Sequence, residues 1–201
     1  MGVPFAESQT KENLMRAFAG ESQARNRYTF AAEQARKEKL QAVEKIFLFT
    51  ADQERAHAQV FYEHLRELAG SSIFVDGGYP VDVYENTLKL LQLAQHNEYQ
   101  EYEDVYPHFG DIAKSEGFSQ VAESFYKIAE IEKVHGERFG LFAEMIEDNT
   151  LHQRMTEERW MCLNCGYIYE GTQVPEKCPV CGHDKGYMIP MEIAPYSAEQ
   201  F

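Results

Sequence analysis

Two Glu-x-x-His motifs and two Cys-x-x-Cys motifs could each provide ligands for a metal ion. The Glu-x-x-His motifs pair Glu54 with His57 and Glu132 with His135. In a helix, the two side chains of such a motif project from adjacent turns of one face and can bind a single ion. One motif alone is weakly informative, since the 7 histidines of this glutamate-rich chain would produce about one such pair by chance. Its weight therefore depends on the residues that accompany it.

A repeated spacing connects each motif to a further glutamate. Glu21 precedes the first motif by 33 residues, and Glu98 precedes the second by 34 residues. The two halves differ at one place, because Glu101 follows Glu98 by three residues where the first half has Ala24. The chain therefore contains two similar halves, one of which carries an additional carboxylate.

Hydrophobic periodicity predicts four long helices that would position these residues, at 8–37, 41–69, 81–115 and 119–147. Pro107 is expected to kink or end regular helix within the third of them. Each helix has a glutamate in the middle of its apolar face: Glu21, Glu54, Glu98 and Glu132. A buried ionised carboxylate is unfavourable unless it is paired, protonated or bound to metal. The four glutamates therefore favour one shared metal site.

The complete set is one glutamate from each of two helices and Glu-x-x-His from each of the other two. That set is typical of ferritin-like di-metal carboxylate bundles, and carboxylate and imidazole ligands suit iron or manganese. We expect Glu54 and Glu132 to bridge two ions. The expected terminal ligands are Glu21 and His57 on one ion, and Glu98 and His135 on the other.

Three further residues are candidates for catalytic roles beside these ligands. Glu101 could be an extra ligand, a proton carrier or a solvated acid, and its position on the inward face favours a role as a ligand. Tyr28 and Tyr102 lie one or two turns from ligand positions and could donate hydrogen bonds to ligand carboxylates. Ordinary core packing is the alternative for both tyrosines.

The four cysteines are Cys162, Cys165, Cys178 and Cys181, in two Cys-x-x-Cys pairs. Four thiolates form a closed tetrahedral site that suits zinc or a single iron, and the spacing does not decide between these metals. From Trp160 onward the chain is aromatic and rich in Gly and Pro, without helical period. We therefore expect a helical domain at residues 1–155 and a small four-cysteine domain at 156–201.

Composition excludes several classes of function. The net charge of −14 disfavours binding to nucleic acid or to an anionic membrane surface. No apolar run is long enough to span a bilayer, and the N-terminal residues lack the pattern of a secretory signal. We therefore expect a cytoplasmic protein, in which paired cysteines indicate metal binding rather than disulfides.

Taken together, these segments resemble the rubrerythrin family over nearly the whole chain. The resemblance lies in the segments 21–28, 52–57, 98–102 and 129–135 of the bundle, and in CLNCGYIYEG with CPVCG of the tail. It implies a mainly α, ferritin-like four-helix bundle followed by a rubredoxin-like domain with iron on its four thiolates. Three iron ions per chain are then expected, with zinc as a possible substitute.

The resemblance also implies an activity. Such a protein would be a homodimeric peroxidase that protects against oxidative stress by reducing hydrogen peroxide to water. Electrons would pass from the thiolate-bound iron of one subunit to the di-iron site of the other, where His57 and Glu101 would exchange as ligands. The electron donor would be a reductase or a rubredoxin, linked indirectly to NAD(P)H, because the chain has no Gly-rich dinucleotide-binding motif.

Two alternatives belong to other functional classes. The first is a ferroxidase or iron-storage protein, which would load well beyond three iron ions per chain. The attached electron-transfer module argues against storage. The second is a non-enzymatic protein in which a zinc ribbon serves as an interaction module, and that protein would be colourless and contain zinc.

Overall fold

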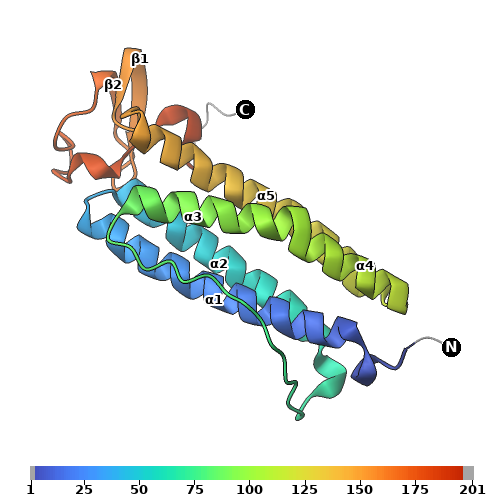
Figure 1. The fold of residues 1–201 in the computed structure, drawn as a ribbon. Coiled ribbons are helices and arrows are strands. Elements are labelled where there is room, and N and C mark those ends of the chain that lie inside the picture. The colour runs from blue at the N-terminus through green and yellow to red at the C-terminus, as the bar shows by residue number, and fades with distance from the viewer. Residues whose placement is uncertain (1–2, 197–201) are drawn as a thin grey trace.

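A bundle of long helices carries a small sheet domain at one end (Figure 1). The structure is a computed structural model that describes residues 3–196. The helices are α1 (Gln9–Lys37), α2 (Gln41–His64), α3 (Thr87–Gln100), α4 (Tyr106–Glu116) and α5 (Ser119–Glu147). Short 3-10 helices occur at Phe5–Glu7, Arg66–Leu68, Lys185–Tyr187 and Met191–Ile193. The strands are β1 (Gln153–Cys162), β2 (Ile168–Gln173) and β3 (Met188–Pro190).

Helices α1 and α2 form one antiparallel hairpin, and α5 packs along both α3 and α4 to form the other pair (Figure 1). Local signals fix the helix ends. Ser8 accepts a hydrogen bond from Lys11 N and begins α1, and Asn86 accepts one from Lys89 N and begins α3. Gly117, with a φ of 96°, ends α4 in the left-handed region that favours glycine.

The predicted helix at 81–115 was wrong at its start. Residues 69–86 form an extended linker, and helical structure resumes only at Thr87, because Asn86 provides the cap. The helix predicted to reach residue 69 also ends earlier, at His64, followed by the turn Arg66–Leu68. Figure 1 shows the linker as a long thin tube that runs back along α1.

A π-helical turn at Glu101–Val105 joins α3 to α4. Its wider hydrogen-bond ring is closed by Tyr106 N–H, which donates to Glu101 O, five residues earlier. Pro107 follows in the first turn of α4, where its missing N–H is tolerated. The expected interruption at Pro107 therefore takes the form of a π-helical turn that adds one residue to the helix.

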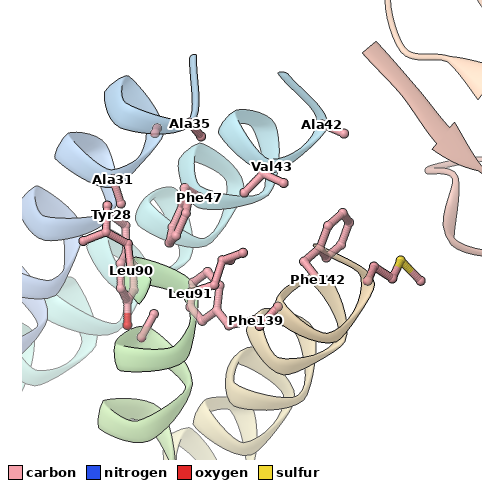
Figure 2. Packing of buried hydrophobic residues seen from close by; sticks show 14 of the residues in the cluster. Tyr28, Ala31, Ala35, Ala42, Val43, Phe47, Leu90, Leu91, Phe139 and Phe142 are labelled. Carbon is pink, nitrogen blue, oxygen red and sulfur yellow. The ribbon is translucent and has the colours of Figure 1, made fainter. Parts of the chain in front are cut away.

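Two apolar layers enclose the middle of the bundle. The layer nearer the sheet domain includes Tyr28, Phe47, Leu91 and Phe139, which point toward one another in Figure 2. The layer at the other end is formed by a second group of buried side chains: Leu14, Phe61, Tyr106 and Phe125. Most of these residues stand seven positions, or about two helical turns, from the glutamate of their helix. The four glutamates consequently lie in a polar layer between two apolar layers.

The C-terminal sheet is antiparallel with strand order β2-β1-β3. Its small core contains Trp160, Val174 and Met188 together with Cys162 and Cys178. Because β1 begins at Gln153, the sheet starts before the boundary that we predicted after residue 155. The division of the chain into two domains near this point remains a proposal. Among residues 3–196, none of the helices has the length and apolar character needed to cross a membrane.

The sheet domain packs closely on the turn between α1 and α2. A Cβ at Gly186 would lie 1.9 Å from Lys39 O and 2.1 Å from Gln41 Oε1. We expect Gly186→Ala to destabilise the protein by about 1–3 kcal/mol, because the backbone of the turn cannot yield to it. Thermal unfolding measures this loss, and Gly78→Ala is the control, since a Cβ at Gly78 meets nothing within 4 Å. Equal melting temperatures for the two variants would contradict this tight packing.

Candidate metal centres

Six buried side chains at the middle of the bundle form two overlapping ligand groups. One group is Glu21, Glu54, His57 and Glu132, and the other is Glu54, Glu98, Glu132 and His135. Within each group the potential ligand atoms lie within 4.8 Å of one another. Glu54 and Glu132 belong to both groups, so the structure brings together all six residues that the sequence identified and places the two expected bridges at the shared positions.

The two shared carboxylates each face both histidines. Glu132 places Oε1 2.9 Å from His57 Nδ1 and Oε2 2.8 Å from His135 Nδ1. Glu54 places Oε2 3.3 Å from His57 Nδ1 and Oε1 2.9 Å from His135 Nδ1. The imidazole rings are nearly parallel, with centroids 5.5 Å apart. Each carboxylate can therefore give one oxygen to each of two ions.

The polar atoms of this site are buried and poorly satisfied. Glu21, Glu54, Glu132 and His135 have no exposed surface. Within residues 3–196, both oxygens of Glu54 and of Glu132, and Nδ1 of each histidine, lack a hydrogen bond of good geometry. Buried acceptors of this kind are costly unless something neutralises them. A pair of divalent cations fits this donor set, which consists only of carboxylates and imidazoles.

The protonation equilibria reflect the same crowding. Burial, reinforced by neighbouring carboxylates, raises the pKa of Glu21, Glu98 and Glu132 well above the usual range. Burial also acts to raise the pKa of Glu54, but the adjacent histidines lower it to about 2. In the absence of cations, Glu54 is therefore ionised while the neighbouring glutamates tend to be protonated. Two bound cations would stabilise the ionised form of all of these carboxylates.

Glu101 lies on the π-helical turn and is not a member of either ligand group. Burial and the charge of Glu54 raise its pKa to about 8, and Arg27 partly offsets this effect. The carboxyl group is therefore close enough to interact with the site, although a role as a ligand stays a prediction.

Two tyrosines donate hydrogen bonds to terminal carboxylates of the site. Tyr28 Oη donates to Glu98 Oε1, as expected from the sequence, and Tyr106 Oη donates to Glu21 Oε1. Tyr102, the other tyrosine predicted for this role, instead packs against the apolar layer, with Lys133 Nζ 5.6 Å from its ring centroid. The extra residue of the π-helical turn rotates the helix face, so Tyr106 occupies the expected place. A seven-residue step from Glu98, like the one from Glu21 to Tyr28, would point to Val105, so the sequence carried no signal for Tyr106 without knowledge of the π-helical turn.

We expect Tyr106→Phe to weaken the site and Tyr102→Phe to leave it almost unchanged. Loss of the hydrogen bond to Glu21 should lower metal affinity by about 10-fold, because such supporting bonds orient the ligand. Competition with a chelator measures the affinity of each variant. Equal affinities would mean that the hydroxyl of Tyr106 does not support Glu21.

The four cysteines of the C-terminal sheet domain lie close together. They are free, and their ligand atoms lie within 4.8 Å of one another. Cys162 Sγ is 3.7 Å from Cys181 Sγ, and Cys165 Sγ is 3.7 Å from Cys178 Sγ. A tetrahedron with metal–sulfur bonds of about 2.3 Å has edges of about 3.8 Å. The spacing therefore fits a tetrahedral metal ion and is too long for disulfides.

The two Cys-x-x-Cys loops have the same backbone geometry. Gly166 N donates to Cys162 O and Gly182 N to Cys178 O, and both glycines have left-handed φ values, 76° and 73°. The hydrogen bond from the backbone N–H of His183 lowers the pKa of Cys181 to about 6, whereas burial raises the pKa of Cys162, so Cys181 forms the thiolate that a metal requires more readily than Cys162 does. Cys165 is exposed, so one side of this site is accessible from outside.

Known proteins match both sites. The family model described as Rubrerythrin matches residues 12–143, and the model described as Rubrerythrin, rubredoxin-like domain, matches residues 160–188. A rubrerythrin of Clostridium perfringens is 42% identical over 181 residues, which cover 90% of this chain and 93% of the relative. A rubrerythrin of Nitratidesulfovibrio vulgaris is 39% identical over 180 residues, with coverages of 90% and 93%.

A solved structure supports the same assignment. Fully reduced, all-ferrous nigerythrin has a TM-score of 0.62 at 29% identity, over 92% of this chain and 90% of that one. The family models cover both ligand sets described above, and the ligands form the di-iron carboxylate site and the rubredoxin-like iron site of a family that binds iron. The chain therefore belongs to the rubrerythrin family.

Proposed function

We propose that this protein reduces hydrogen peroxide to water and so protects against oxidative stress. The observation that carries the proposal is the presence of two centres in one chain: a buried carboxylate–histidine site for two ions and a four-thiolate site for one. An iron-storage protein needs no attached electron-transfer centre, because the stored iron is itself the reductant. A peroxidase needs one, since its di-iron site must be reduced again after each turnover.

The reaction consumes two electrons and two protons for each peroxide and yields two waters. Bound ferrous ions would supply the two electrons and polarise the O–O bond. The residues of the chain would hold the ions, exclude bulk water and move protons. Tyr28 and Tyr106 fix the terminal carboxylates Glu98 and Glu21, and we propose that Glu101, whose pKa burial and Glu54 raise to about 8, delivers a proton. We further propose that Glu101 and His57 alternate as ligands of one iron.

Stopped-flow absorbance tests the proposal. Anaerobically reduced protein with three irons per chain is mixed with stoichiometric hydrogen peroxide. Rapid oxidation, followed by return of the red colour of the ferric thiolate centre, is the expected result. No fast reaction would contradict peroxide reduction, and iron loading well beyond three ions would favour storage instead. Glu101→Ala should slow turnover while most iron stays bound, whereas exposed Glu103→Ala on the same turn serves as the matched control.

We propose that the working unit is a homodimer in the cytoplasm. Within one chain, the sheet domain packs against Gln41 at the start of α2. Glu54 follows 13 residues later, a distance of about 20 Å along the helix. An apolar groove of about 690 Å³, whose lining includes Phe49, Val134 and Leu141, lies between α2, α5 and the sheet domain. We propose that a second copy covers this groove, where Phe49, Val134 and Leu141 are exposed, and that the thiolate centre of one copy reduces the di-iron site of the other.

Sedimentation of the iron-loaded protein tests the dimer, and a monomer at micromolar concentration would contradict it. Electrons would enter the exposed side of the thiolate centre from a separate reductase or a rubredoxin, ultimately from NAD(P)H. Steady-state peroxide reduction with each candidate donor identifies which of them the protein accepts.

A further inference from the structure

Residues 76–82 of the linker lie across helix α1, and three side chains of α1 bind to them. We call this segment the strap. The attachments are Arg16 Nη2 to Asp76 Oδ1 at 2.9 Å, Gln23 Nε2 to Pro80 O at 2.7 Å, and Arg27 Nη1 to Asp82 Oδ2 at 2.8 Å. The three helical residues are separated by seven and four positions and so share one face of α1. Figure 1 shows the linker following this helix.

The two ends of the strap are held with unequal strength. The Arg27 and Asp82 side chains are only 11% and 13% exposed, and Asn97 Nδ2 also donates to Asp82 Oδ2 at 2.9 Å. Asp76 is 90% exposed, so its ion pair with Arg16 contributes little, and one further hydrogen bond, from Arg16 Nε to Asp76 O at 2.9 Å, holds this end. Two glycines, Gly77 and Gly78, follow the weak end. The strap therefore has a firm anchor beside α3 and a weak one next to a flexible pair of residues.

A cavity of about 220 Å³ lies beneath the strap. The strap residues 77–80 cover it, Ala17 and Gly20 of α1 form one wall, and Glu101 and Tyr106 form part of the opposite wall. Tyr106 is the donor to Glu21, and Glu101 interacts with Glu54. The cavity thus leads from the surface to two groups that touch or adjoin the iron ligands, and it can contain several water-sized molecules.

Tyr79 stands at the mouth of this cavity. Its ring faces Gly20, where an added Cβ would lie 3.6 Å from Tyr79 Cε1, and its hydroxyl donates to Arg16 O at 3.1 Å. Tyr79 is 38% exposed, so its outer side meets solvent while its inner side closes the cavity. One hydrogen bond to a backbone carbonyl holds the ring in place, and such a bond contributes only about 1 kcal/mol.

We propose that this cavity is the route by which the oxidant reaches the di-iron site, and that Tyr79 is a gate that admits small peroxides and excludes bulky alkyl hydroperoxides. The inference rests on the proposed function and deepens it, because it assigns a substrate path and a residue that determines specificity. Gly20 also keeps the entrance open, since a larger side chain at that position would project toward Tyr79 and fill the entrance.

Two variants test the route from opposite directions. Gly20→Leu narrows the entrance and Tyr79→Ala widens it, while Tyr84→Ala changes an exposed tyrosine outside the strap and is the control. With pre-reduced protein, we expect Gly20→Leu to slow oxidation by hydrogen peroxide about 10-fold or more without loss of iron. Tyr79→Ala should speed oxidation by tert-butyl hydroperoxide by about the same factor and leave the rate with hydrogen peroxide nearly unchanged.

A probe that is not reduced separates the route from the activity. Azide is mixed with the oxidised, iron-loaded protein, and its binding is followed by absorbance. Gly20→Leu should slow azide binding about 10-fold, in parallel with the peroxide reaction. If the unaltered protein did not reduce peroxide, the proposed function would be wrong. The rate of azide binding would still show whether small molecules reach the di-iron site through this cavity. Unchanged azide rates in Gly20→Leu, or an unchanged preference between the two peroxides in Tyr79→Ala, would overturn the proposal.

Discussion

In the metal-free protein, the free energy of unfolding of the helical bundle should fall as the pH rises from about 5 to about 8. Four carboxyl groups of the metal-free bundle have a raised pKa: buried Glu21, Glu98 and Glu132, and partly buried Glu101. In the unfolded chain they would titrate near 4.5. Between that value and their folded pKa, the folded state binds protons that the unfolded state does not. Folding is therefore favoured at low pH and is progressively opposed as these protons are lost.

The size of the effect follows from the shift of a single group. For Glu101 the pKa rises from 4.5 to about 8, which corresponds to a loss of up to about 5 kcal/mol of unfolding free energy across this range. Glu54 contributes in the opposite sense, because its pKa is lowered to about 2. Its stabilising contribution is fully present above about pH 5 and is lost only in stronger acid, so it does not cancel the slope.

Thermal unfolding of the metal-free and iron-loaded proteins, at a series of pH values, measures this difference. Iron should restore the melting temperature most strongly at the high end of the range, since bound cations stabilise the ionised carboxylates. Metal-free Glu101→Gln should show a smaller pH slope than the unaltered chain, and exposed Glu103→Gln should show the same slope. A metal-free protein with no loss of stability between these pH values would contradict the proposed state of the buried carboxyl groups.

The ligands of both metal centres could be predicted because their positions follow simple periods. Glu21, Glu54, Glu98 and Glu132 lie on regular helices, where a step of three or four residues preserves the buried face. Cys-x-x-Cys likewise sets its own geometry, because each pair forms one short loop. Local spacing therefore carried the information about these ligands, and the structure brings them together as expected.

Features that depend on contacts between distant residues could not be predicted. The π-helical turn at 101–105 moves Tyr106, rather than Tyr102, onto the inner face, and no propensity rule indicates where such a turn occurs. The strap has the same character. Residues 81–86, which begin at the end of the strap, contain enough apolar side chains to suggest a helix, yet they form none, and the largely buried ion pair of Asp82 with Arg27 fixes this end of the strap on α1.

Replacement of Cys165 by serine should abolish continuous peroxide reduction while leaving one reaction of the pre-reduced di-iron site intact. Cys165 is the exposed ligand of the four, so its replacement disturbs the small core of Trp160, Val174 and Met188 less than replacement of buried Cys162 would. Replacing one thiolate with a hydroxyl changes the colour and the reduction potential of a four-thiolate iron site, and here we expect the change to disable electron transfer. We expect steady-state turnover to fall about 100-fold or more.

Two measurements on the same sample separate the centres. Steady-state turnover with an external donor requires both of them, whereas a single reaction of chemically reduced protein requires only the six bundle ligands. Val180→Ser is the matched control, because Val180 lies in the other Cys-x-x-Cys loop and its side chain is exposed but is not a ligand. A Cys165→Ser protein that also lost the single reaction would show that the bundle site depends on the sheet domain for more than electrons. Undiminished steady-state turnover would instead place the entry of electrons directly at the bundle, and the thiolate centre would then have another role.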